Sequence, residues 1–262
     1  MKVNKDKPTF SETVPIELKE LGYIPPIIKS YDKDGVLVRL EMRRYSVANN
    51  SDCPVWLLYV DGIQWMSFDP EHDQAFNVYS HYYLAYGHVI CTGLGFGIRE
   101  QWIASKPEVT KVTVLEKFKE VIDYHKDIGT KWSDKIEIIN CDANDYKGNC
   151  DFLSIDHYEF DDALNIISSI KKISNNITCE CTWFWMLENW IRLGYIEDNP
   201  PYYSTDKPKK TSYGGKENDI LENYIKIKKY FWLDKLPSLS EVELMKFINM
   251  YYRRLYESNT RI

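Results

Sequence analysis

Short apolar runs alternate with amphipathic segments through the middle of the chain. The apolar runs cover residues 88–93, 111–116, 135–140, 151–155 and 177–185. The segments between them with helical spacing of apolar side chains cover 97–105, 118–127 and 161–174. Strands that alternate with helices of about ten to fifteen residues are typical of βαβ units with a parallel sheet. The pattern predicts an α/β fold, a Rossmann-like doubly wound and mostly parallel sheet.

The regions on either side of this pattern differ from it. Two stretches of β-forming residues, 36–47 and 55–68, precede it, and the second contains Asp61-Gly62, a pair typical of hairpin turns. Residues 196–218 are rich in Pro, Gly and Lys without periodicity, which predicts a loop. Helices are expected at 220–231 and 240–256.

The second of these helices has apolar residues at helical spacing, which predicts one apolar face. Its members are Val242, Leu244, Met245, Phe247, Ile248 and Tyr251. The chain as a whole is therefore expected to have a β-rich N-terminal extension (1–85), a Rossmann-like domain (86–195), and a loop with a helical C-terminal extension (196–262).

Composition favours a soluble protein of the cytoplasm. The 262 residues are 44% hydrophobic, and no apolar run approaches the ~18 residues that span a bilayer. The first residues lack the apolar centre of a secretory signal. A net charge of −6 argues against nucleic acid as a partner. The six cysteines form no C-x-x-C motif, so neither a metal site nor a disulfide framework is expected.

The strongest candidate for chemistry is Thr92-Gly93-Leu94-Gly95-Phe96-Gly97, directly after a predicted strand and before a predicted helix. Glycines at such a turn allow a sharp bend and the close approach of a ligand, and the helix that follows begins with a partial positive charge. A tight turn without a ligand is the alternative explanation.

Acidic residues follow the next three strands. Glu116 ends the second predicted strand, where a Rossmann domain accepts hydrogen bonds from ribose hydroxyls. Asp142 follows the third strand, where it could meet an adenine ring, and Asp156 follows the fourth. Because open α/β sheets bind ligands at the carboxyl ends of their strands, these residues predict a nucleotide site.

The glycine motif lacks residues that several common nucleotide-binding motifs require, so some classes of nucleotide are disfavoured. Ile98 stands where the dinucleotide pattern requires glycine or alanine, so NAD and FAD are disfavoured. The lysine and hydroxyl pair of a P-loop is absent. The run Asn199-Pro200-Pro201-Tyr202 spells a motif of amino-group methyltransferases, but it lies outside the expected position after the fourth strand.

Four segments of the chain together resemble class I S-adenosylmethionine-dependent methyltransferases, in particular the spermidine-synthase-like branch. These segments are HVICTGLGFG, KVTVLEKFKEVI, IEIINCDAND and DFLSID. The resemblance covers about residues 55–185. It implies that S-adenosyl-L-methionine is the cofactor and assigns most of its binding residues by position. Those residues are Gly93, Gly95 and Gly97 for the amino-acid part, Glu116 for the ribose, Asp142 and Ala143 for the adenine, and Asp156 at the reacting centre. Leu94 and Lys117 complete the predicted cofactor-binding set.

The chain departs from aminopropyltransferases of that branch at several motifs. Their G-G-G-D-G is replaced by G-L-G-F-G, and their D-x-x-D-P by Asp156-His157-Tyr158-Glu159-Phe160. Their upstream acidic pair and Tyr-His-Glu signature are only partly matched, by 71–73 and 79–81.

Asp156 and His157 are the candidate catalytic residues, since His157 could act as a general base for the acceptor. Tyr158 and Glu159 are candidate substrate contacts. Trp65 and Trp185 could line the substrate pocket, although core packing is the ordinary explanation for such residues.

The sequence therefore predicts a methyltransferase that uses S-adenosylmethionine and a small-molecule or other unidentified acceptor. Two alternatives stay open: aminopropyl transfer from the decarboxylated donor, and a non-catalytic protein that binds the cofactor. The sequence does not predict the oligomeric state.

Overall fold

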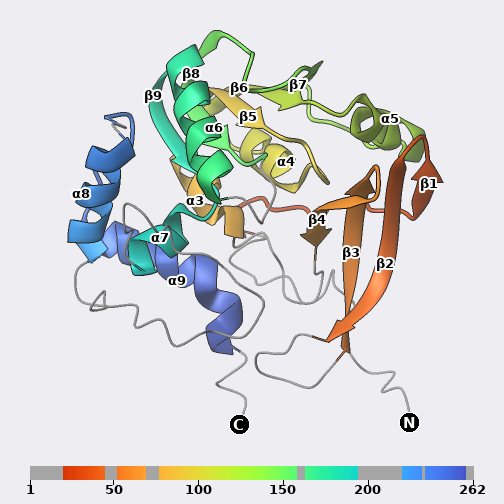
Figure 1. Cartoon of the computed structure of the whole chain (residues 1–262), viewed down its shortest axis with the longest axis horizontal. Coiled ribbons are helices and arrows are strands. Elements are labelled where there is room, and N and C mark those ends of the chain that lie inside the picture. Colours follow the sequence, from red (N-terminus) through yellow and green to blue (C-terminus); the bar gives the residue numbers. More distant parts are fainter. Residues whose placement is uncertain are drawn as a thin grey trace.

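The computed structural model describes residues 20–44, 52–68, 77–157, 163–193, 220–231 and 234–257. It contains two sheets, one antiparallel and one parallel. Figure 1 shows the antiparallel sheet, in orange, to one side of the parallel sheet, which runs from yellow to teal. Within the described ranges, no helix has the length and apolarity that crossing a bilayer requires.

The antiparallel sheet is formed by four consecutive strands in the order β1-β2-β3-β4. These are β1 (Tyr31–Lys33), β2 (Val36–Arg44), β3 (Asp52–Val60) and β4 (Ile63–Phe68). Asp61 and Gly62 connect β3 to β4 with φ angles of 49° and 79°. Two successive positive φ values match the type I′ turn that an Asp-Gly pair favours. The predicted hairpin is therefore confirmed.

The parallel sheet has five strands in the order β7-β6-β5-β8-β9. These are β5 (Gly87–Thr92), β6 (Val109–Glu116), β7 (Ile136–Asn140), β8 (Gly148–Ile155) and β9 (Ile177–Phe184). All four neighbouring pairs are parallel. The chain begins in the middle, moves outward through β6 and β7, and then returns to the other side of β5. This is the strand order of a Rossmann-like fold, and it reverses between β5 and β8.

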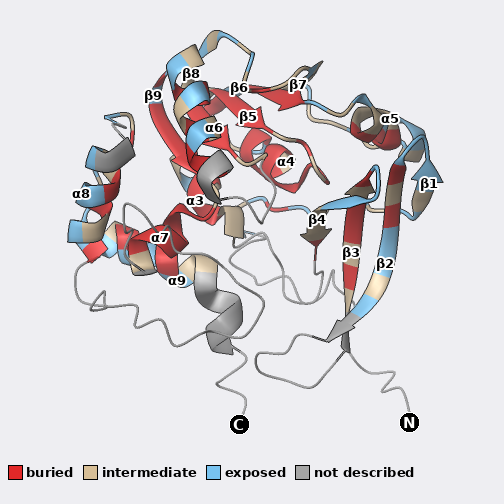
Figure 2. Ribbon diagram, viewed as in Figure 1, coloured by how far each residue is buried: buried red, intermediate tan, exposed pale blue. Residues whose placement is uncertain are grey.

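Helices cover both faces of the parallel sheet, as the sequence predicts. The three helices that connect its strands are α4 (Ile98–Ala104), α5 (Lys119–Ile128) and α6 (Ala163–Asn176). Crossovers between parallel strands are right-handed, so connections that run in opposite directions place their helices on opposite faces. Accordingly α4 and α5 share one face and α6 covers the other. Figure 2 shows the central strands buried between them.

The C-terminal helices pack beside the end of the parallel sheet. These are α8 (Ile220–Phe231) and α9 (Glu241–Glu257), and both contact the short helix α7 (Leu187–Leu193). A further helix, α3 (Tyr79–Leu84), precedes β5 and contacts α4 and α9. The predicted C-terminal helices are confirmed, whereas α3 and α7 were not expected. The domain boundaries themselves stay a prediction.

The apolar face expected for α9 is only partly correct. Leu244, Phe247 and Ile248 are buried, but Val242 is 78% and Met245 37% exposed. The buried residues follow an i, i+3, i+4 spacing, which places them on one stripe of the helix. Val242 and Met245 fall outside that stripe. The predicted loop at 196–218, with Asn199-Pro200-Pro201-Tyr202, lies outside the described residues.

Candidate functional site

The glycine turn after β5 has a backbone that requires glycine. Gly93, Gly95 and Gly97 have φ angles of 77°, 50° and 72°, in the left-handed region. A Cβ atom at Gly93 would overlap the carbonyl oxygen of Asp156. Cβ atoms at Gly95 and Gly97 would each come within 2.5 Å of a protein side chain, Met66 Sδ and Trp132 respectively. The glycines are thus needed both for the turn and for close packing against the protein itself.

The side chains of Arg99 on α4 and Glu116 at the end of β6 bind the backbone of this turn. Arg99 Nη2 donates to the carbonyl oxygens of Thr92 and Gly93, both at 2.9 Å. Glu116 Oε2 accepts the amide of Leu94 at 2.8 Å, and its Oε1 accepts the amide of Phe118. Within the described part of the chain, Gly95 has the one amide of residues 93–97 without a hydrogen-bond partner. The turn is therefore a largely closed hydrogen-bonded unit.

His125 on α5 contacts the middle of the turn. Its Nε2 lies 2.8 Å from the carbonyl oxygen of Gly95, and its Nδ1 lies 3.0 Å from the hydroxyl of Thr130. A carbonyl oxygen can only accept, so Nε2 carries the proton and Nδ1 accepts from Thr130. Burial lowers the pKa of His125 to about 4, which keeps the ring neutral at pH 7.

Met66 on β4 covers the exposed side of the turn. Its Sδ accepts the amide of Phe96 at 3.3 Å and lies close to Gly95. Met66 is an unbranched side chain with several rotatable bonds, so it can move away at low cost. The antiparallel sheet therefore places a flexible side chain directly against the turn.

A buried ion cluster connects the turn to Asp156. Arg99 and Glu100 have side chains that are 5% and 3% exposed, and they pair at 2.6 Å. Arg99 Nη1 also lies 3.3 Å from Asp156 Oδ2. Burial opposes the charge of Arg99, but the nearby Glu100, Cys91 and Asp156 raise its pKa, so it stays protonated.

Asp156 directly follows β8, and its carboxyl group can still bind a ligand or exchange a proton. Burial of its carboxyl group raises the pKa to about 6, with Arg99 opposing the shift and Glu100 adding to it. Even so, 34% of its side chain surface is accessible, so it faces an opening. A carboxyl group with a pKa near 6 can accept or donate a proton near neutral pH.

His157 is tied into a chain of hydroxyl groups. Its Nδ1 lies 2.8 Å from Thr92 Oγ1 and its Nε2 lies 2.9 Å from Ser169 Oγ. Ser169 donates to Asn144, so its oxygen accepts from Nε2–H, and Thr92 then donates to Nδ1. Burial lowers the pKa of His157 to about 4. The proposed general-base role stays a prediction, and two occupied ring nitrogens argue against it.

The predicted adenine-side residues lie together after β6 and β7. Lys117 Nζ lies 3.2 Å from Asp142 Oδ2, and Asn144 donates twice to Oδ1 of the same carboxylate. Burial pushes the pKa of Asp142 upward, but these hydrogen bonds more than offset it and lower the pKa. Ala143 is buried beside them. Asp142 is thus ionised and partly accessible.

The predicted substrate contacts differ in what the structure says of them. Trp65 packs against Phe118, whose amide donates to Glu116, with ring centroids 4.9 Å apart. The amide of Trp185 donates to the carbonyl of Ile155, so it lies next to Asp156 along the sheet edge. Tyr158 and Glu159 lie outside the described residues.

A second buried polar cluster lies on the α4 side of the sheet. Ser80 and the indole of Trp183 donate to Glu188 Oε1, and His81 lies 2.7 Å from Ser154 Oγ. Burial raises the pKa of Glu188 to about 7. Ser80 and His81 come from the segment that partly matches the Tyr-His-Glu signature, and they are buried core residues in this chain.

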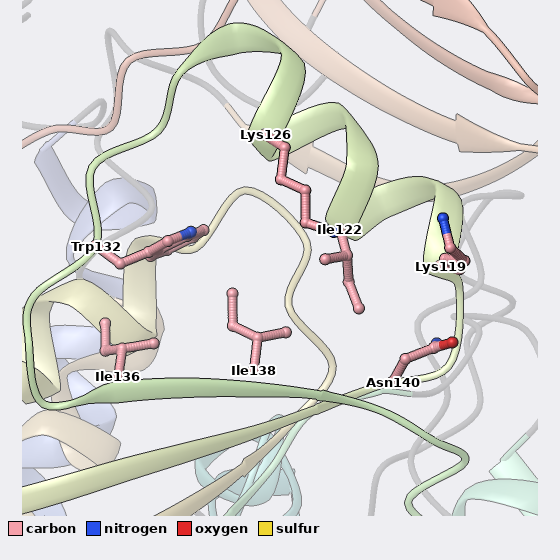
Figure 3. Close-up of a pocket in the computed structure, with 7 residues that line it drawn as sticks. All are labelled: Lys119, Ile122, Lys126, Trp132, Ile136, Ile138 and Asn140. Atoms are coloured by element: carbon pink, nitrogen blue, oxygen red, sulfur yellow. The ribbon is translucent and has the colours of Figure 1, made fainter.

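A cavity of about 370 Å³ lies between α5 and the edge strand β7. Figure 3 shows the side chains of Ile122 and Ile138 pointing toward one another across it, with Trp132 at one end and Asn140 at the other. Trp132 also packs on Gly97, and Asn140 donates to the carbonyl of Glu116. The cavity is therefore lateral to the glycine turn and shares its supporting residues.

The sequence did not identify Arg99, His125 or Met66 as parts of the site. His125 and Met66 are each 30 residues away from their partners in the turn, so only the structure shows that they meet. Arg99 is close to the turn in the sequence. The pair Arg99-Glu100 inside a short apolar helix was the available signal, because adjacent charges there must be buried together.

No protein-family model and no curated protein sequence matches the chain. Among solved structures, it is similar to a spermidine synthase in complex with the transition-state analogue AdoDATO. That match has 16% identity and a TM-score of 0.37, and covers 55% of this chain and 56% of the other. A probable spermidine synthase from Corynebacterium glutamicum ATCC 13032 matches at 13% identity and a TM-score of 0.39, over 59% of this chain and 61% of the other.

A putative RNA methyltransferase from Pyrococcus horikoshii matches at 15% identity and a TM-score of 0.35, over 46% of this chain and 60% of the other. The chain thus matches less than two thirds of the length of each of these proteins. At such identities and scores, what this chain binds has to be decided by its own residues.

Proposed function

We propose that this protein binds S-adenosylmethionine at the carboxyl edge of β5–β8 and transfers its methyl group to an acceptor that is not yet identified. The observation that carries the proposal is that the candidate binding residues meet at one edge of the sheet. Four parallel strands bring the glycine turn, Glu116, Asp142 and Asp156 to one edge, at the point where the strand order reverses. Open α/β sheets bind nucleotides at this position.

The residues present fit such a ligand, with one condition. Gly93 and Gly95 are partly exposed, the Gly95 amide is unpaired among described residues, and Asp156 is accessible. The carboxylate of Glu116 accepts the backbone amides of Leu94, Phe118 and Lys117, and because a carboxylate offers about four lone-pair sites, one is left for a ribose hydroxyl. The condition is that Met66 moves away from Gly95, which its flexible side chain permits.

When bound, S-adenosylmethionine supplies an electrophilic methyl group on a positively charged sulfur. Asp156 is the residue we assign to the acceptor, because its carboxylate can orient a hydroxyl or amine and accept its proton. Arg99 orients that carboxylate through the 3.3 Å contact at Nη1. In this proposal His157 is a positioning residue, since both ring nitrogens are occupied by hydroxyl groups. Alignment of the reactants can contribute about 7–11 kcal/mol of barrier lowering.

The test is calorimetric titration with S-adenosylmethionine, S-adenosylhomocysteine and decarboxylated S-adenosylmethionine. We expect micromolar binding of the first two, lost in Gly95→Arg because the new side chain has to displace Met66 and then occupies the place that the ligand needs. Gly62→Arg is the matched control. Gly62 also has a positive φ, 79° against 50° at Gly95, but no atom lies within 4 Å of a Cβ there, so this variant should bind normally.

The outcomes separate the alternatives. A preference for the decarboxylated donor would favour aminopropyl transfer. Binding without turnover across a panel of hydroxyl and amine acceptors would favour a non-catalytic protein. Binding of none of the three ligands to the folded wild type would refute the proposal.

A further inference from the structure

Two thiols lie side by side at the end of the parallel sheet opposite to the glycine turn. Cys150 near the start of β8 and Cys179 near the start of β9 are direct partners in the strand register. Both are free cysteines, 9% and 8% exposed. Side chains of directly paired residues in neighbouring strands point to the same face. The side chains of Cys150 and Cys179 therefore lie next to one another on one face of the sheet.

We propose that Cys150 and Cys179 form a reversible disulfide when the folded protein meets hydrogen peroxide. Neighbouring strands lie about 4.7–4.9 Å apart, and disulfides join Cα atoms about 4.4–6.8 Å apart. The bridge therefore requires rotation of two side chains and little movement of the backbone. No part of the proposed methyl transfer depends on this pair.

Cys179 is the thiol that reacts first. The neighbouring Cys150 thiol lowers the pKa of Cys179, against the effect of burial, and the Lys235 ammonium adds to the lowering. Lys235 is fixed nearby because its Nζ donates to the carbonyl oxygens of Ser174 and Ile177. The small exposed fraction of the pair favours an oxidant as small as peroxide over bulky thiol reagents.

The reaction balances with peroxide as the oxidant. The Cys179 thiolate attacks one peroxide oxygen, the O–O bond breaks, and hydroxide leaves a sulfenic acid on Cys179. The sulfur of Cys150 then attacks the sulfenic sulfur, forms the S–S bond and releases the hydroxyl group as water. Two thiols lose two electrons, and one peroxide becomes two waters.

The bridge would enclose the segment that contains α6. Ser169 on α6 contacts His157, so this segment also supports the residue next to Asp156. Closing a loop of this kind restricts the unfolded chain, so the folded state is stabilised relative to it. We expect the oxidised protein to melt roughly 5–10 °C above the reduced protein.

The test is a non-reduced peptide map of the whole chain after treatment with hydrogen peroxide and alkylation of remaining thiols. Cleavage after Lys147 and Lys171 isolates Cys150, and cleavage after Glu180 separates Cys179 from Cys181. The expected result is a cross-linked peptide containing Cys150 and Cys179, lighter by two hydrogen atoms and reversed by dithiothreitol.

Variants and a melting curve make the result decisive. Cys150→Ser and Cys179→Ser should lose both the cross-link and the rise in Tm. Cys181→Ser, on the same face of β9, is the matched control and should keep both. A cross-link to Cys181 or Cys91, a sulfinic acid at Cys179 without a bridge, or an unchanged Tm after oxidation of the wild type would overturn the proposal.

Discussion

The glycine turn and Asp156 lie in contact, yet they differ in how far their polar groups are satisfied. The turn has its carbonyls and amides bound by Arg99, Glu116 and His125 from separate elements. Asp156 has a partly accessible side chain and a pKa raised to about 6. A saturated unit contributes shape and stability, whereas an incompletely satisfied carboxyl group keeps capacity for a ligand or a proton.

This difference separates scaffold from chemistry inside one site. Changes in the turn should lower the stability of the whole fold as well as ligand binding, whereas changes at Asp156 should alter binding or turnover while the fold persists. If substitutions in both places lowered the stability equally, the distinction would be wrong.

The largest effect is expected for Arg99→Met. The change leaves Glu100 as an unpaired buried charge and removes the donors to Thr92 and Gly93, so the free energy of unfolding should fall by about 3–5 kcal/mol. Urea denaturation measures it. Arg39→Met removes an exposed arginine and should leave the free energy of unfolding nearly unchanged. Should Arg99→Met fail to fold, Arg99→Lys provides a milder comparison with an intermediate loss.

Gly93→Ala comes next. A Cβ atom there combines left-handed backbone strain with overlap on the Asp156 backbone, so a loss of about 2–4 kcal/mol in unfolding free energy is expected. Gly129→Ala is the matched control, since Gly129 has a φ of 76° but an open environment. It should lose only about 1–2 kcal/mol. Equal losses at the two positions would show that packing against Asp156 contributes nothing.

Met66→Ala tests whether Met66 on β4 blocks the ligand site at the turn or forms one of its walls. If Met66 occupies space that the ligand needs, its removal should tighten S-adenosylmethionine binding about tenfold, equivalent to ~1.4 kcal/mol. Calorimetry on this variant and on the exposed Met42→Ala control gives the comparison. Weaker binding in Met66→Ala would mean that Met66 is a wall of the ligand site.

The smallest effect, and the one with a distinctive sign, is expected for Asp156→Asn. A raised pKa means that the stability contributed by Asp156 is present below about pH 3.8 and lost as pH rises through 6. Asp156→Asn should therefore be more stable than the wild type at pH 7.5, by up to about 1 kcal/mol, with the difference shrinking toward pH 4.

Asp142→Asn is the control of opposite sign. The pKa of Asp142 is lowered, so its contribution is present at neutral pH and lost as pH falls through the folded-state pKa. That variant should be less stable than the wild type at pH 7.5. Denaturation at several pH values measures the stability of both variants relative to the wild type. If this stability difference changed with pH in the same direction for both variants, the pKa direction assigned to one of the two carboxylates would be wrong.

The order of strands and helices in the parallel sheet was predictable because each apolar run is bounded by polar or glycine residues. The Asp61-Gly62 turn was predictable because few other pairs tolerate two positive φ angles. By contrast, α3 contains Tyr79, Tyr82 and Tyr83, which favour strands in isolation. Its helical form depends on packing, since Tyr82 stacks on Trp102 at 4.2 Å.

The candidate site divides in the same way. Glycines and acids at strand ends could be located from position alone. The contacts of His125 with Gly95 and of Met66 with Phe96 could not, because each joins segments about thirty residues apart through side-chain geometry. Whether Glu116 binds a ribose, a backbone amide or both is likewise decided by where the turn lies.

The central place of β5 has a consequence during synthesis. This strand emerges first among the five, and β6 can cover one of its edges soon afterwards, but its other edge waits for β8. Until then an apolar strand with unpaired amides and carbonyls is available to a second nascent chain. Fragments that stop before β8 should therefore aggregate. A ribosome that stalls between β7 and β8 would hold the chain at the stage when the unpaired edge of β5 makes it most prone to aggregation.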